Sequence, residues 1–273
     1  MAGKPKKEFH QYLTEGQRGA HVSHDEYLKS PATAFLRHTI EAKSAIDLCS
    51  RKFPKNSDGS YSKASLDSLQ HLTVAVLPTI MGHFETYQRY LFGGIFDRSI
   101  QIEGFDIEDF FKKLNKQCNV SIDPIRLAAY RGLGASSIGS LLADSLLSWH
   151  NPEKVNAYFN CFNISNQFYS NDAANQLKVL WQLRHSIVHT GGTLTLADAQ
   201  KVDTLNDKGD KQIVFENQFI FEVARKLHPI VKAATEGVAN AFKSNLKPGL
   251  EQAIIDDIDT FFEVKSTIAV WLK

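Results

Sequence analysis

Apolar residues recur at helical spacing along most of the chain. This spacing is clearest in five segments, and it predicts long helices over residues 32–49, 65–96, 172–189, 217–244 and from Pro248 onward. Weaker signals predict shorter helices over 106–115 and 136–149, after Asn151-Pro152, from Thr195 to about 205, and a short element from Asp123. The only strand-like segment is Gln212–Phe215. The pattern therefore predicts an all-α protein, an antiparallel helical bundle with a minor hairpin or strand element.

The first sixty residues differ in character from the rest of the chain. Residues 1–31 are polar and contain Gly16 and Gly19, so we interpret them as an arm with at most a short helix. A basic, turn-rich stretch at 51–59 follows the first predicted long helix. We therefore divide the chain into an N-terminal arm and helix, residues 1–60, and a helical bundle, residues 61–273.

The predicted helix 172–189 has the clearest end signals in the sequence. Asn171 or Asp172 can cap its first turn, and Gly191-Gly192 can end it in a left-handed turn. In the predicted helix 65–96, Pro78 is expected to produce a kink.

Composition and charge narrow the class of protein. The chain has 273 residues, 43% of them hydrophobic, and a formal net charge of +1, so it carries no overall basic field. Three widely spaced cysteines exclude a disulfide framework and a four-cysteine zinc site, and they fit a reducing, cytoplasmic location. The longest apolar stretch, residues 72–84, is interrupted by Pro78 and His83, so we expect no membrane segment.

Arg184 occupies an unusual position on the predicted helix 172–189. On a helical wheel with about 100° per residue it falls within the apolar face, among Leu177, Trp181 and Val188. His185 and His189 fall along the edge of the same face. Because an unpaired buried charge costs several kcal/mol, Arg184 needs either a carboxylate partner or a wet cavity that an anion can enter.

Glu85 is the acid that best suits either interpretation. It lies at the edge of the apolar stripe of the predicted helix 65–96. It could pair with Arg184 in the core, or it could orient one of the two histidines beside an anion-binding cavity.

These residues resemble a known family. Arg184-His-Ser-Ile-Val-His189, followed by Thr-Gly-Gly, resembles the Arg-x4-His motif of the ribonuclease type of the HEPN superfamily, in its large, RiboL-PSP-like branch. The polar residue directly after the arginine, here His185, is typical of that motif. The segment Phe84–Leu91 resembles the family's first bundle helix, in which an aromatic–acidic pair precedes a hydrophobic run. The resemblance covers roughly residues 65–245.

The resemblance implies a metal-independent endoribonuclease that forms a homodimer and needs no cofactor. Arg184 would bind the scissile phosphate, and His189 would act as general base or general acid. His185 would position the RNA or tune His189. The family also implies a role as a toxin or an anti-phage defence effector, with an antitoxin or defence-system protein as a further partner.

Two alternatives use the same residues differently. His185 and His189 have the i, i+4 spacing by which two histidines share one metal ion, with Glu85, His83 or Glu41 as a third ligand. Other members of the HEPN superfamily lack catalysis and serve as binding or scaffold modules of toxin–antitoxin or defence systems.

Overall fold

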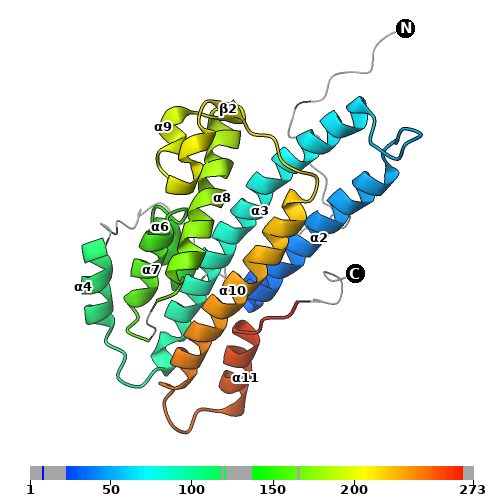
Figure 1. Ribbon diagram of the computed structural model, residues 1–273. Helices are drawn as coiled ribbons and strands as arrows, with labels where there is room; N and C mark the ends of the chain where they lie inside the picture. Colours follow the sequence, from blue (N-terminus) through cyan, green and yellow to red (C-terminus); the bar gives the residue numbers. More distant parts are fainter. Residues whose placement is uncertain (1–7, 9–22, 118–119, 121–136, 165–166, 267–273) are drawn as a thin grey trace.

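Four long helices form an antiparallel bundle: α2 (Pro31–Lys52), α3 (Lys63–Arg98), α8 (Asn171–His189) and α10 (Phe219–Lys243). The computed structural model describes residues 8, 23–117, 120, 137–164 and 167–266, so the element predicted at Asp123 lies outside the described residues. In Figure 1, α2 and α8 run in the direction opposite to α3 and α10. Helix α3 contacts the other three and lies at the centre. The predicted all-α class is confirmed.

Shorter elements surround this bundle. They are α1 (His24–Lys29), α4 (Ile107–Gln117), α6 (Ile138–Ser145), α7 (Pro152–Asn160), α9 (Leu196–Ala199), α11 (Gln252–Phe261) and 3₁₀ helices at Ser99–Gln101 and Asp203–Lys208. Strand β1 (Thr193–Leu194) pairs antiparallel with β2 (Lys211–Gln212), which confirms a minor strand element. The strand predicted at Gln212–Phe215 begins one residue earlier and ends at Gln212. The helix predicted from Thr195 to about 205 is interrupted after Ala199 and resumes as 3₁₀ turns.

The capping residues fix where α7 and α8 begin. Asn151 accepts a hydrogen bond from the Lys154 N–H at 3.0 Å, and Pro152 occupies the first turn of α7, as predicted. For α8 the predicted cap was wrong, because Ser170 accepts the bond from the Ala173 N–H at 3.2 Å. Ser170 has extended backbone angles, whereas Asn171 already belongs to the helix.

The crossing of α3 and α6 depends on two glycines. Helix α3 is continuous through Pro78 and reaches Gly93, where its backbone meets that of Gly139 in α6. A Cβ atom at Gly93 would lie 2.8 Å from the Gly139 carbonyl oxygen. Helix α6 ends earlier than predicted because the Ala143 carbonyl accepts bonds from the Leu146 N–H and from the Trp149 indole at 3.1 Å.

One large hydrophobic core runs through the bundle. Residues on both sides of the predicted division at residue 60 contribute to it, with Phe35 from α2 packing edge-on against Phe84 from α3. A separate small cluster contains Leu194, Ala199 and Leu205, from β1, α9 and the following 3₁₀ helix. Within the described residues, no helix combines the length and apolar character needed to cross a membrane.

Candidate functional site

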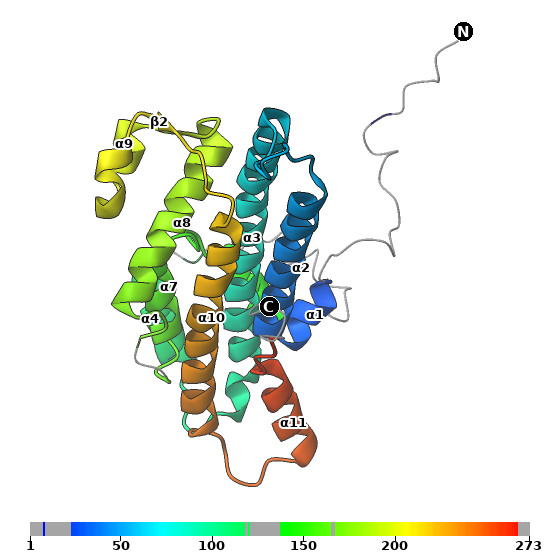
Figure 2. The same cartoon turned by 45° about the vertical axis from the view of Figure 1, so that its right-hand side comes forward.

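The C-terminal end of α8 lies at one end of the bundle, beside α9 and the β-hairpin (Figures 1 and 2). Two consecutive left-handed glycines, Gly191 at φ 62° and Gly192 at φ 84°, end the helix as predicted. The Gly192 N–H returns to the Ser186 carbonyl at 3.1 Å, and the Ile213 N–H bonds the Gly192 carbonyl at 2.7 Å. The turn therefore holds the hairpin next to the predicted site residues.

Arg184 is half-buried on α8, and its Nε atom is inaccessible to water. This Nε has no hydrogen-bond partner, and within the described part of the chain no carboxylate forms an ion pair with the guanidinium. An unpaired guanidinium N–H in such a position has lost water without gaining an acceptor. Arg184 therefore carries a positive charge that no carboxylate of the described residues neutralises.

His185 faces a charged pair carried by α9. Its Nε2 atom lies 3.9 Å from Asp198 Oδ1, and Asp198 in turn accepts a 2.7 Å bond from Lys201. Desolvation by burial lowers the pKa of His185, the negative charge of Asp198 opposes this shift, and the positive charges of His189, Lys201 and Arg184 add to it. The bond from Lys201 lowers the pKa of Asp198.

His189 is the last residue of α8 and is exposed. Its ring centroid lies 4.7 Å from that of His185, with the two planes at 43°. The two imidazoles and the guanidinium, which we call the α8 cluster (Arg184, His185 and His189), thus occupy the last two turns of one helix. Val188, predicted on the apolar face, is 48% exposed because it lies beyond the end of the core.

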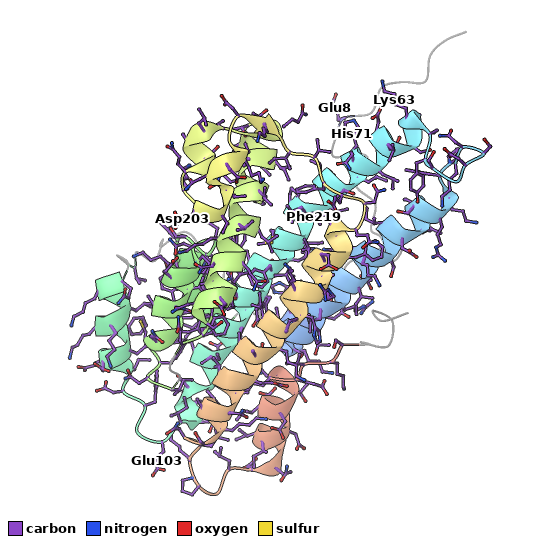
Figure 3. The ribbon with its side chains drawn as sticks, in the orientation of Figure 1. Glu8, Lys63, His71, Glu103, Asp203 and Phe219 are labelled. Atoms are coloured by element: carbon purple, nitrogen blue, oxygen red, sulfur yellow. The ribbon has the colours of Figure 1, made fainter. Side chains whose placement is uncertain are left out.

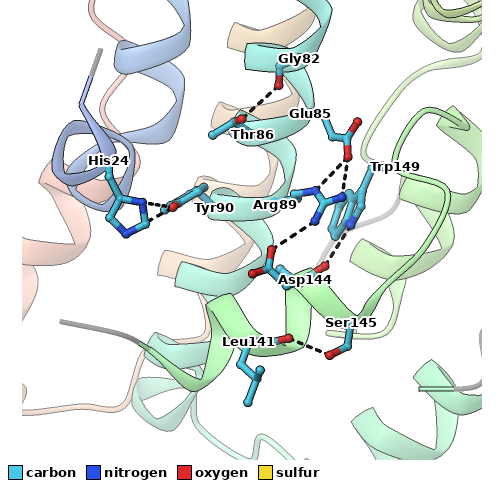
Figure 4. Close-up of polar contacts among 11 residues, drawn as sticks. His24, Gly82, Glu85, Thr86, Arg89, Tyr90, Leu141, Asp144, Ser145 and Trp149 are labelled. Atoms are coloured by element: carbon cyan, nitrogen blue, oxygen red, sulfur yellow. Dashed lines mark hydrogen bonds and ion pairs between the residues drawn. The ribbon is translucent and has the colours of Figure 1, made fainter. Parts of the chain in front are cut away.

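Glu85 does not take the predicted part in this cluster. Its Oε1 atom accepts a 3.0 Å bond from Arg89 Nε one turn along α3. Arg89 also bonds Asp144 of α6 at 3.2 Å and lies over the Trp149 ring, 6.0 Å from its centroid (Figure 4). Because Arg89 is the nearer partner, Glu85 contributes to a structural charge network that joins α3 to α6.

A lateral pocket of about 330 Å³ opens beside the α8 cluster. Helices α7 and α8 and the segment after α9 line it, through His150, Asn151, Pro152, Glu153, Lys178, Trp181, Gln182, His185, Lys201 and Val202. Trp181 is 5% exposed, and its indole Nε1 is a second buried donor for which the described residues supply no acceptor. His185 is the member of the α8 cluster that also lines this pocket.

The residues considered for a metal site are dispersed. His83 Nδ1 is 2.8 Å from the Tyr27 hydroxyl, and Glu41 accepts a 2.9 Å bond from Arg37. Across the described ranges, no three His, Cys, Asp or Glu side chains are grouped so that they could hold a metal ion.

The sequence pattern placed Trp181 on the apolar face of its helix and did not identify His150, Lys178, Gln182 or Lys201. A signal was present on α8, because Lys178, Trp181, Gln182 and His185 fall within about 100° of one another on the helical wheel. No sequence signal placed Asp198 and Lys201 opposite them, since that contact is tertiary.

Comparisons of the chain with protein-family models, with curated proteins and with solved structures found no match.

Proposed function

We propose that this protein is a metal-independent endoribonuclease with its catalytic centre at the α8 cluster. The observation that carries the proposal is the guanidinium of Arg184, which pairs with no carboxylate of the described residues, on the same helix end as two imidazoles whose ring centroids lie 4.7 Å apart. A fixed cation suits a phosphodiester, and histidine exchanges protons near neutral pH. The resemblance of residues 184–189 to the HEPN motif favours RNA as the substrate.

The cleavage reaction uses the nucleophile that RNA itself carries. His189 removes the proton of the ribose 2′-hydroxyl, and the 2′-oxygen forms a bond to phosphorus. Arg184 stabilises the additional negative charge of the pentacoordinate transition state. The bond from phosphorus to the 5′-oxygen breaks, a second imidazole protonates that oxygen, and the products carry a 2′,3′-cyclic phosphate and a 5′-hydroxyl.

The second imidazole comes from His185 or from a second copy of the chain. In a homodimer the two α8 ends would meet, so that each His189 faces the Arg184 of its partner. Exposed apolar side chains at this end of the molecule support such an interface, namely Val188, Leu196 and Val214.

A non-catalytic binding module is the second candidate. The observation that favours it is the engagement of Glu85 by Arg89, which leaves His189 without a carboxylate contact in the described part of the chain. Under either function, we propose a toxin or defence role in the cytoplasm, with an antitoxin or defence-system protein as a restraining partner.

Purified protein incubated with structured and unstructured RNA in EDTA tests the catalytic proposal. We expect cleavage by the wild type, with cyclic phosphate ends, and a loss of about 10²–10³-fold in rate for Arg184→Ala and His189→Ala. His71→Ala is the matched control, since it removes an exposed histidine of α3 outside the cluster (Figure 3). Binding of RNA without cleavage would favour the binding module, and cleavage that requires added metal would contradict the mechanism.

A further inference from the structure

The lateral pocket beside the α8 cluster has features that the proposed chemistry does not use. We propose that this pocket binds one unstacked base of the RNA strand, next to the bond that is cleaved, and thereby sets the base preference of the protein. The inference rests on the proposed function in its choice of RNA as the ligand.

The strongest indication is the unpaired indole of Trp181. The chain satisfies another buried indole, that of Trp149, with the Ala143 carbonyl at 3.1 Å. Trp181 lines the pocket, and its Nε1 has no acceptor within the described residues. A buried donor without an acceptor is destabilising. Because Nε1 itself is closed to solvent while the Trp181 side chain lines the pocket, ligand binding must turn the indole toward an acceptor such as a base carbonyl or ring nitrogen.

The size and lining of the pocket fit a base. A volume of about 330 Å³ lies at the lower end of the range for small-molecule sites. The exposed His150 ring lines the same pocket and makes a T-shaped contact with Trp181, with ring centroids 6.3 Å apart. Protein domains that read single-stranded RNA hold splayed bases through such aromatic faces and hydrogen bonds to the base edge.

Cations at the rim suit the phosphates on either side of the base. Lys178 pairs with Glu153 and Lys201 pairs with Asp198, and both lysine side chains remain partly exposed. The Asp198 side chain is only 8% exposed, whereas that of Lys201 is 57% exposed. The pair therefore presents mainly the ammonium group of Lys201 to solvent. A nucleotide in the pocket would therefore have its base against Trp181 and its phosphate near Lys201.

His185 connects the pocket to the α8 cluster. It lines the pocket, lies 3.9 Å from Asp198 Oδ1, and has its ring 4.7 Å from that of His189. A base held in the pocket would place its own ribose and phosphate close to these two imidazoles. The base preference and the position of the cleaved bond would thus be set by residues on successive turns of α8, namely Trp181, His185 and His189.

Binding of 2′-O-methylated hexanucleotides separates base recognition from cleavage, because these probes lack the free 2′-hydroxyl. Fluorescence anisotropy with labelled homopolymers of adenine, cytosine and uracil, and with a guanine-rich hexamer, gives the affinity for each base. We expect the wild type to prefer one base, and Trp181→Phe to weaken binding of that hexamer by about two- to tenfold, erasing the preference. Lys201→Met should weaken all four hexamers alike, whereas Lys112→Met, an exposed lysine of α4, should change nothing.

Wild-type binding without base preference, or a preference unchanged in Trp181→Phe, would overturn the inference. If Trp181→Phe does not fold, Val202→Phe narrows the same pocket and should likewise erase the preference. A base preference in a protein that cleaves no RNA would refute the proposed function but support the pocket. Cleavage by a protein without base preference would support the proposed function and refute base recognition in the pocket.

Discussion

Arg184 places a permanent positive charge where one of its nitrogens reaches neither water nor an acceptor. A side chain of this kind lowers stability relative to an apolar one of similar length, because the lost hydration is not replaced. Proteins retain such groups where a ligand supplies the missing interaction. The half-buried guanidinium of Arg184 therefore links the stability of α8 to the function that we propose for the α8 cluster.

Replacing Arg184 by methionine should separate these two properties. We expect Arg184→Met to abolish cleavage while leaving the free energy of unfolding within about 1 kcal/mol of the wild type, or raising it, because the apolar chain fills the space without an unpaired N–H. Urea denaturation measures the change. Leu177 is fully buried about two turns earlier in α8. Leu177→Ala should lower the free energy of unfolding by about 2–5 kcal/mol and serves as the reference for a destabilising change. A comparable loss for Arg184→Met would mean that the guanidinium stabilises the fold.

The charge on His185 should respond to its neighbours on α9. Since Asp198 raises the pKa of His185 and Lys201 lowers it, we expect Asp198→Asn to lower that pKa further and Lys201→Met to raise it. Titration of the ring protons by NMR measures both shifts. Asp203→Asn, in the exposed 3₁₀ turn that follows, is the control and should leave the titration unchanged (Figure 3).

The direction of the pH effect on stability follows from the lowered pKa of His185 in the folded chain. Desolvation lowers the pKa of His185 in the folded chain, so the unfolded chain binds the proton more tightly. The contribution of His185 to stability is thus complete above the pKa of the unfolded state and is lost as the pH falls through the lower folded pKa. A stability gain on acidification that disappears in His185→Gln would contradict this sign.

At the scale of helices, the contact of α3 with α6 sets a strict size limit. A Cβ atom at Gly139 would lie 2.0 Å from the Gly93 carbonyl oxygen, which belongs to the backbone of α3 and cannot move aside. We expect Gly139→Ala to destabilise the protein by about 1–3 kcal/mol, measured by urea denaturation. Gly82→Ala, at an open position of α3, should instead stabilise by about 0.5–1 kcal/mol. Equal effects of the two substitutions would refute the close crossing.

The long helices were predictable because each buries one face, and that face leaves a periodic trace in the sequence. Ends were harder to predict, as at α8, where Ser170 and not Asn171 has the extended backbone that a cap requires. Helix α6 ended early because of a bond from Trp149, a contact that periodicity does not encode. The local pattern therefore predicted the elements, while their limits depended on backbone angles and on side-chain contacts that periodicity does not encode.

Which residues of the candidate site lie close together was predictable within one helix but not between helices. Arg184, His185 and His189 share one helix, so their proximity follows from spacing alone. The partner of Glu85 was not predictable, because α3 offers Arg89 one turn away and the choice between it and Arg184 depends on how two helices are rotated. Asp198, Lys201 and the pocket arise from the packing of α9 on α8, which no local pattern specifies.

At the scale of the whole molecule, the proposed homodimer depends on the exposed end of α8. We expect the wild type to sediment as a dimer and Val188→Asp to sediment as a folded monomer that no longer cleaves RNA, because the carboxylate would be desolvated in the interface. Leu48→Asp, at an exposed apolar position of α2, is the matched control and should remain dimeric. An active monomer of the wild type would exclude a composite site.

The small cluster of Leu194, Ala199 and Leu205 is separate from the main hydrophobic core, so its free energy of opening need not equal that of the bundle. A unit with so few buried apolar side chains opens at a lower free energy than the bundle to which it is attached. Asp198 belongs to α9 and Lys201 follows it, so we expect both to move with that unit, whereas Trp181 and His185 lie on α8 of the bundle. We expect such fluctuation to move one wall of the lateral pocket without unfolding a long helix, so that the proposed RNA ligand enters while the imidazoles of α8 keep their positions.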